Sequence, residues 1–194
     1  ENGLYTRSGK ALAGGDPLDN AVQSPVTLLA GDFDGDGVED GLAIQAGFGT
    51  QARHLLFRGA QAPAAPLQEA VEWFVSGPST TSAAAGDFDG DGTPDVVLLR
   101  DLEAAGKRVT LHASGTDWAA TVDVSIPSIS GAFLTALDAD QDGALDVLVG
   151  GGGVSPSLQV LPGDGLGGLG ASIVVDLSTA FGARGSSAGD RALG

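Results

Sequence analysis

Three segments of the sequence place aspartate at every second position. They begin at Asp32, Asp87 and Asp138, and each follows the pattern D-x-D-x-D-G-x-x-D. The full segments read AGDFDGDGVEDGLAI, AGDFDGDGTPDVVLL and ALDADQDGALDVLV. A hard cation such as Ca²⁺ takes several oxygen ligands, and a tight loop with alternating carboxylates supplies them. We therefore interpret the three segments as cation-binding loops.

Each loop offers four carboxylates and one main-chain carbonyl. The carboxylates come from positions 1, 3, 5 and 9 of the pattern, the carbonyl comes from position 7, and glycine at position 6 permits a sharp turn. The expected ligands are Asp32, Asp34, Asp36, the carbonyl of Val38 and Asp40; Asp87, Asp89, Asp91, the carbonyl of Thr93 and Asp95; and Asp138, Asp140, Asp142, the carbonyl of Ala144 and Asp146. We expect about three Ca²⁺ ions, one in each loop.

The spacing argues against two alternatives. An EF-hand loop needs a bidentate glutamate at position 12 and a helix on each side. Position 12 is Ala43, Leu98 or Val149, each inside an apolar run that is typical of a strand. Mg²⁺ fits less well than Ca²⁺, because it retains several waters and uses few protein ligands. No Lys or Arg lies within any of the three loops, so a bound cation would relieve the repulsion among the carboxylates.

Short apolar runs bounded by Gly, Pro, Ser or Asp surround each loop and predict β-strands. One run precedes the loop and three follow it, so a unit of roughly 50 residues holds four strands, which is the size of a β-propeller blade. We predict an all-β fold made of propeller-type blades with four antiparallel strands each. The expected organisation is one repeat domain over residues 1–194, with a partial blade at 1–26, repeats at 27–80, 81–130 and 131–180, and a degenerate repeat or tail at 181–194.

The loops resemble the FG-GAP and VCBS repeats, which form the blades of integrin α-subunit propellers and of many bacterial secreted proteins. The resemblance lies in GDFDGDGVED, GDFDGDGTPD and LDADQDGALD. It implies one Ca²⁺ in the loop between the first two strands of each blade, and no catalytic activity. Three motifs are too few to close the ring usual in that family, which implies a fragment, an open stack or a subunit completed by another chain. The third loop has Leu137 and Gln141 where the others have glycine, so we expect it to bind metal with an altered turn geometry.

Composition narrows the range of partners. The chain of 194 residues has 25 Asp and Glu against 9 Lys and Arg, a net charge of −16. It therefore lacks the basic face that nucleic acid requires, and no apolar run is long enough to insert into a membrane. The absence of cysteine excludes disulfides, thiolate zinc sites and cysteine nucleophiles.

Four other side chains could do chemistry. His54 and His112 lie in corresponding third strands, and we expect an equivalent strand position rather than a catalytic pair. Trp73 and Trp118 are expected to fill space between blades, with stacking on a sugar as the alternative. Neither a nucleophile elbow nor a suitably spaced pair of carboxylates outside the loops is visible, so we expect no enzymatic activity.

The leading hypothesis is a non-enzymatic, calcium-stabilised module of a secreted or cell-surface protein. Its role would be adhesion, recognition or scaffolding, with a protein or glycan as ligand. The extracellular location follows from calcium, because weak sites fill at extracellular calcium concentrations and stay largely empty in the cytosol. One alternative is a self-assembling subunit of an extracellular ring or filament that pairs edge strands with its neighbours. The other is the propeller part of a polysaccharide-acting enzyme.

Overall fold

The computed structural model describes residues 25–46, 52–59, 67–76, 79–102, 105–114, 118–127, 129–152 and 157–177. Twelve strands in these ranges form three antiparallel sheets of four strands each. The all-β prediction with four antiparallel strands per unit is therefore confirmed. The expected N-terminal partial blade and C-terminal tail fall almost entirely outside the described residues and stay predictions.

Each sheet is a simple meander in which the strands pair in chain order. The first sheet consists of β1 (Pro25–Gly31), β2 (Asp40–Gln45), β3 (Ala52–Gly59) and β4 (Leu67–Ser76). The second consists of β5 (Thr80–Gly86), β6 (Asp95–Asp101), β7 (Lys107–His112) and β8 (Ala120–Ile126). The third consists of β9 (Ser130–Leu137), β10 (Asp146–Gly152), β11 (Ser157–Leu161) and β12 (Ile173–Asp176).

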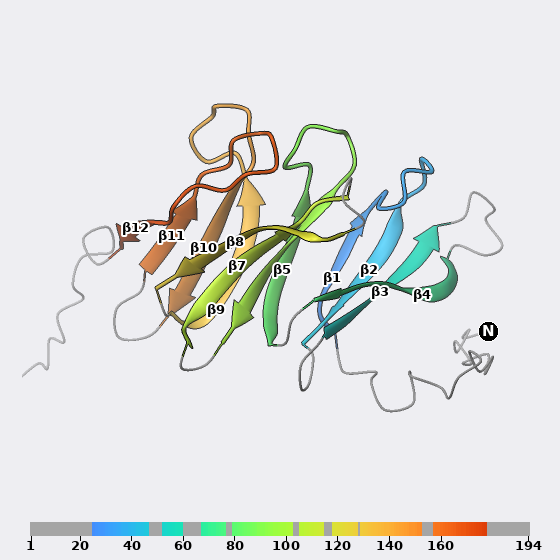
Figure 1. Cartoon of the computed structure of the whole chain (residues 1–194), viewed down its shortest axis with the longest axis horizontal. Helices are drawn as coiled ribbons and strands as arrows, with labels where there is room; N and C mark the ends of the chain where they lie inside the picture. The colour runs from blue at the N-terminus through green and yellow to red at the C-terminus, as the bar shows by residue number, and fades with distance from the viewer. Residues whose placement is uncertain are drawn as a thin grey trace, which may run out of the picture.

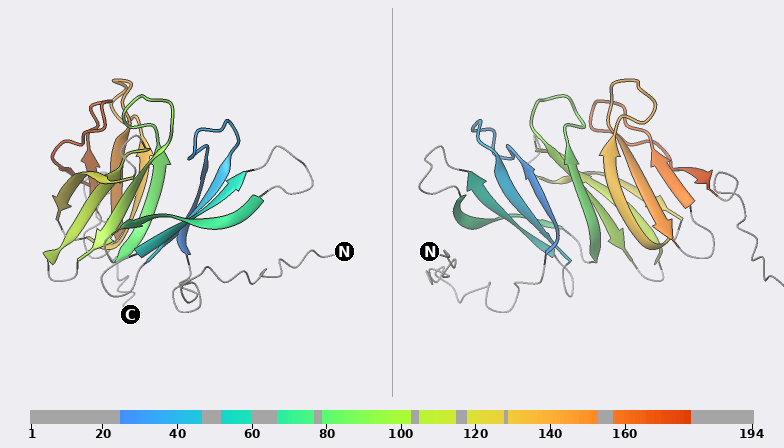
Figure 2. Two further views of the ribbon diagram at one scale, coloured as in Figure 1. Left: turned by 45° about the vertical axis from the view of Figure 1, so that its right-hand side comes forward. Right: turned by 180° about the vertical axis from the view of Figure 1, so that it is seen from behind.

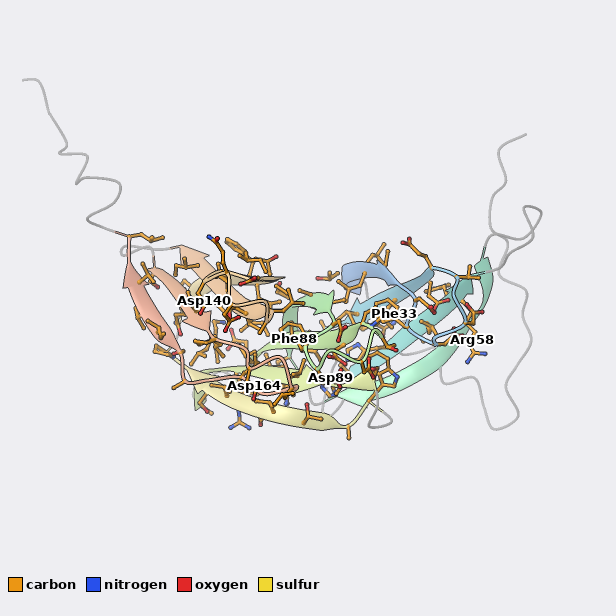
Figure 3. All side chains as sticks on the ribbon, turned by 90° about the horizontal axis from the view of Figure 1, so that it is seen from above. Phe33, Arg58, Phe88, Asp89, Asp140 and Asp164 are labelled. Carbon is orange, nitrogen blue, oxygen red and sulfur yellow. The ribbon has the colours of Figure 1, made fainter. Side chains whose placement is uncertain are left out.

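The three sheets pack face to face in a row (Figures 1 and 2). Their first strands β1, β5 and β9 lie next to one another, and the row is curved when it is seen from above (Figure 3). The turns that join the first two strands of each sheet all lie on the same side of the row, at the top of Figure 1. The three aspartate motifs occupy these turns, so the fold places them in corresponding positions of successive sheets.

Each sheet has a front face, turned toward the preceding sheet of the row, and a back face, turned toward the following one. Side chains alternate between the two faces along each strand. The back face of the first sheet packs on the front face of the second through Leu42, Ile44 and Leu56 against Ala83, Val96 and Leu98. The back face of the second sheet packs on the front face of the third through Val97, Leu99, Val109 and Leu111 against Leu134, Val147, Val149 and Leu161.

The central sheet explains the apolar run Val96–Leu99. All four side chains are fully buried, because a neighbouring sheet covers each face. A strand that is buried on both faces loses its alternating pattern and becomes a continuous apolar run.

A glycine precedes the first two aspartate motifs because the next sheet sits on it. A Cβ atom at Gly86 would overlap the Cδ1 atom of Leu145, and one at Gly31 would meet the Cγ atom of Pro94 at 3.1 Å. The third sheet has Leu137 at this position, where it is partly exposed. Among the described residues no further sheet follows the third, so the reason for glycine is absent there.

The substitution Gly86→Leu is expected to lower the free energy of unfolding by about 1–3 kcal/mol, because it overpacks the contact with Leu145. Leu137→Gly, the reverse change at the corresponding position, is expected to cost about 1 kcal/mol or less. Urea denaturation of the two variants and the native chain measures the difference. Equal losses of stability in both variants would contradict the role given to Gly86.

His54 and His112 do not occupy equivalent positions, so that expectation is wrong. His112 pairs with Val96, whereas the corresponding residue of the first sheet, which pairs with Gly41, is Phe57. The pairing of β3 with β4 has a register shift at His54 and Leu55, and the pairing of β7 with β8 has one at Leu111 and His112. Both histidines are buried, and the Nδ1 atom of His54 accepts the backbone N–H of Gln45 at 3.2 Å.

Burial lowers the pKa of His54 to about 3, and repulsion from His112 adds to this effect. Burial lowers the pKa of His112 as well. The folded protein therefore holds His54 neutral, while the unfolded chain takes up a proton there below about pH 6.5. The stability that depends on a neutral His54 is complete above pH 6.5 and is lost progressively as the pH falls toward 3.

We expect the free energy of unfolding to fall by about 2 kcal/mol between pH 6.5 and pH 5 on account of His54 alone. Urea denaturation at intervals of half a pH unit measures this slope. His54→Gln, which keeps a polar side chain without a titrating group, is expected to flatten the slope. The same pH dependence in the variant and in the native chain would show that His54 is not responsible.

Candidate metal centres

The three aspartate loops share one pattern of internal hydrogen bonds. The carboxylate at position 1 uses both oxygens to accept backbone N–H groups three to five residues further along the loop, at 2.7–3.1 Å. Position 3 accepts the N–H of position 5 at 3.1–3.2 Å. Position 5 accepts the N–H of position 7 at 2.7–2.8 Å. At positions 3 and 5 these bonds use only Oδ1, so Oδ2 is the oxygen that the turns do not engage.

Positions 4 and 6 of the loops have positive φ. At position 6 the values are 83°, 90° and 95° for Gly37, Gly92 and Gly143, and nothing lies within 4 Å of a Cβ built on them. Glycine is therefore required there by the backbone conformation and not by lack of space. At position 4 of the third loop, Gln141 has φ of 68°, close to the values for Gly35 and Gly90. The altered geometry expected for the third loop is therefore wrong, because Gln141 adopts the conformation of the glycines.

The aspartate at position 9 joins each loop to the end of the third strand. In the first loop Asp40 Oδ2 accepts the N–H of Phe33 at 3.0 Å, and Oδ1 accepts the N–H of Gly59 at 2.7 Å. Asp95 and Asp146 make the same two bonds, with distances of 2.8–2.9 Å. All three carboxylates are buried. Position 9 therefore has a structural role that the sequence did not indicate.

The partners of position 9 could have been found only through the strand pairing. They are Gly59, Ser114 and Gly163, which lie 17 or 19 residues after the aspartate. Two of the three are glycines, and a glycine at this place in the repeat does not by itself indicate that its N–H binds the aspartate.

Carboxylate oxygens converge in all three loops, and each group could hold a metal ion. The groups are Asp32, Asp34 and Asp36; Asp87, Asp89 and Asp95; and Asp138, Asp140 and Asp146, with ligand atoms that lie within 4.8 Å of one another. Positions 1 and 3 belong to every group. The third member is position 5 in the first loop and position 9 in the other two, so each group contains three of the four predicted carboxylates.

The remaining predicted ligands lie close by. Asp40, Asp91 and Asp142 belong to the same loops but not to these groups. Val38, Thr93 and Ala144, the residues of position 7, are half-buried in the loops and donate their N–H groups to position 5.

The first loop has a cationic neighbour. The Nε atom of Arg58, on β3, lies 3.0 Å from Oδ2 of Asp34, and Figure 3 shows Arg58 beside this loop. Burial raises the pKa of Asp34, repulsion from Asp40 and Asp36 raises it further, and Arg58 opposes these effects. Arg58 comes from a different strand, so a search for basic residues within the loop could not identify it.

The second loop has a polar neighbour instead. Ser114 Oγ donates to Oδ2 of Asp91 at 3.4 Å. Burial raises the pKa of Asp95, although two backbone N–H groups oppose the shift. The turn after β11 also touches this loop, because the N–H of Gly167 donates to the carbonyl of Phe88 at 3.0 Å.

An open hollow of about 280 Å³ lies between the first two loops. Its walls include Asp34 and Asp91, and Phe33 and Trp118 also line it. Trp118 is buried and packs on Phe33 with the ring centres 6.1 Å apart and the planes inclined by 58°. Trp118 therefore fills space between two sheets, as expected, and presents little ring surface for a sugar. The side chain of Trp73 lies outside the described residues.

Neither protein-family models nor curated proteins match this sequence. Within the described ranges, no helix has the length and apolarity needed to cross a lipid bilayer. The sites therefore have to be interpreted from their own chemistry, which is that of oxygen-rich loops able to hold cations.

Proposed function

We propose that the chain is a non-enzymatic, calcium-binding module of the FG-GAP or VCBS type, and that its three sheets are blades of a propeller-like stack. It would belong to a secreted or cell-surface protein and serve adhesion, recognition or scaffolding. The observation that carries the proposal is the repetition of one loop geometry in three successive sheets, with carboxylate oxygens converging in each.

The donor set fits a hard cation. Two ligands on opposite sides of a Ca²⁺ ion, each about 2.4 Å from it, are about 4.8 Å apart. In every loop, one carboxylate oxygen from each of three aspartates lies within that distance of the others. Positions 3 and 5 use only Oδ1 in the turns, which makes Oδ2 the expected ligand atom. In the first loop an ion would take the place of Arg58 at Oδ2 of Asp34, and in the second it would compete with Ser114 for Oδ2 of Asp91.

Two considerations favour calcium over magnesium. Each loop supplies several carboxylates and a main-chain carbonyl, whereas Mg²⁺ prefers few protein ligands and retains its waters. The loops are short and continue into strands at both ends, so their oxygens cannot easily rearrange around an ion. Ca²⁺ accepts an irregular arrangement of ligands, whereas Mg²⁺ requires a nearly ideal octahedron.

An extracellular setting follows from the expected weakness of such sites. Calcium sites of extracellular modules have dissociation constants near millimolar, and they fill because the surrounding calcium is of that order. The bound ions would also reduce the repulsion within a chain whose net charge is −16.

Titration calorimetry with CaCl₂ tests the proposal. We expect three sites in the native chain. Asp34→Asn, Asp89→Asn and Asp140→Asn should each weaken one site about tenfold or more, because the charge of a ligand common to all three groups is removed. Asparagine keeps the Oδ1 acceptor of the turn, so the loop itself should be retained.

Asp123→Asn is the matched control, since Asp123 lies on β8 and pairs with Arg108 outside the loops. It should leave all three sites unchanged. Three unaltered sites in each of the loop variants would rule out the loops as the calcium ligands.

A further inference from the structure

The row of sheets has an unpaired front face at one end and an unpaired back face at the other. Both internal junctions join the back face of one sheet to the front face of the next. Among the described residues, the front face of the first sheet and the back face of the third have no sheet against them.

Leu28 shows that the front face of the first sheet is unpaired. It lies opposite Ala43 on β2, as Ala83 lies opposite Leu98 and Leu134 opposite Val149. Ala83 and Leu134 are each 6% exposed, because the preceding sheet covers them, whereas Leu28 is 72% exposed. On the same face Ala30 is also exposed and Phe57 is half-buried, while Ala43 and Leu55 beside them are covered.

The back face of the third sheet is apolar across all four strands. Phe133 and Ile173 are 62% and 56% exposed, and Leu137 and Val175 are partly exposed. A Cβ atom at Gly150 would meet the Cζ atom of Phe133 at 2.8 Å, so the phenyl ring lies across this glycine on the back face. The half-buried residues Leu148, Leu158 and Val160 complete the face.

The corresponding positions of the second sheet are buried. Leu148, Leu158 and Val160 correspond to Val97, Val109 and Leu111, which are fully buried against the third sheet. The described side chains on both unpaired faces are uncharged, apart from Asp146, whose oxygens are occupied by backbone N–H groups.

We propose that the back face of the third sheet binds the front face of the first sheet of a second copy of this chain. The contact joins the faces of sheets rather than their edge strands, and it repeats the junction that the chain already makes twice. Such a contact is heterologous, so each copy keeps one face for a further partner and the copies associate head to tail. This inference concerns the sheet faces and does not depend on metal in the loops.

The contact is small and opposed by charge. Four strands about 4.8 Å apart, with about five residues each, present roughly 300 Å² to a partner, well below the area that a stable complex usually buries on each side. Two copies, each with a net charge of −16, also repel each other. We therefore expect weak association that is visible only toward about 1 mM protein and is strengthened by salt.

The loop end of this contact differs from the internal junctions. At the internal junctions, Leu145 or Pro94 of one sheet lies on a glycine of the preceding sheet. In the contact between two copies, Glu39 of one copy would lie on Leu137 of the other. This difference is a further reason for weak association, and it places the main contact on the strands rather than on the loops.

Sedimentation velocity from about 10 µM to 1 mM protein, at low and high salt, tests the proposal. The native chain is expected to associate. Leu28→Asp and Ile173→Asp should each weaken association at least tenfold, because each places a charge on one of the two faces. Leu166→Asp is the control, since Leu166 is 82% exposed but lies in the turn after β11 and on neither face.

Mixing the two blocked variants is the decisive step. The Leu28→Asp chain keeps its back face and the Ile173→Asp chain keeps its front face, so an equimolar mixture should form a one-to-one complex and stop there. Circular dichroism checks folding, and Leu28→Ser and Ile173→Ser serve if an aspartate variant does not fold.

Three results would overturn the proposal: a native chain that stays monomeric at 1 mM in high salt, an equal effect of Leu166→Asp, or a mixture that does not associate. Calcium titration of the same samples is a separate measurement. Three calcium sites in a strictly monomeric chain would reject this inference and leave the proposed function standing, whereas association without calcium binding would do the reverse.

Discussion

Removal of calcium with EDTA is expected to lower the free energy of unfolding by about 2.7 kcal/mol for each loop that calcium fills at 100 times its dissociation constant. With three loops the loss reaches about 8 kcal/mol, which is comparable to the entire stability of many domains. The physical reason is that carboxylate oxygens within 4.8 Å of one another repel when no cation lies between them. For a chain of this length the loss corresponds to a decrease of roughly 16–32 °C in the melting temperature.

Differential scanning calorimetry in EDTA and in calcium at 100 times the dissociation constant, which is about 0.1 M for a millimolar site, measures this change. Sodium chloride at about 0.5 M, added to the EDTA sample, is the control for general screening of the net charge of −16. The added salt should restore only a small part of the stability, because it screens the net charge without coordinating the carboxylates. A melting temperature that EDTA leaves unchanged would remove the basis for calcium in the loops.

The fold could be predicted from the sequence because local signals agree with one another. Apolar runs such as Val96–Leu99 mark strands, and the glycines and aspartates of the loops mark the turns between them. What the sequence could not give is the exact alignment of the later strands. Gly41 on β2 pairs with Phe57, whereas the corresponding Val96 on β6 pairs with His112, so the two histidines occupy different positions in corresponding strands.

The candidate site was predictable only where its residues are close together in the sequence. Positions 1 and 3, which belong to all three groups, are close in sequence, so their convergence in one turn follows from local spacing alone. Arg58 reaches the first loop from β3, and the N–H partners of position 9 come from the end of the third strand. These contacts depend on how strands pair, and a pattern within the loop carries no information about them.

Replacement of the aspartate at position 9 should lower the free energy of unfolding more than replacement of any other loop carboxylate. Asp95 is fully buried and accepts the N–H groups of Phe88 and Ser114 at 2.9 Å. Asp95→Ala leaves two N–H groups without this acceptor, and each such group costs about 1–3 kcal/mol when it is buried. The burial that raises the pKa of Asp95 also means that removing the charge returns part of this cost. We expect a net loss of about 3 kcal/mol in EDTA, measured by urea denaturation.

Asp91→Ala in the same loop is the matched comparison, because Asp91 is exposed and its turn contact with Thr93 is at the surface. In EDTA, Asp91→Ala should lower the free energy of unfolding by less than about 1 kcal/mol. In calcium, the same variant should also lose the stabilisation that the ion provides. Asp95→Ala should be costly in both conditions. If both variants lose stability only in calcium, position 9 acts as a metal ligand and not as a structural link. If Asp95→Ala alone is costly in EDTA, the loop is held to the sheet before any ion binds, and calcium enters a site that the strands have already shaped.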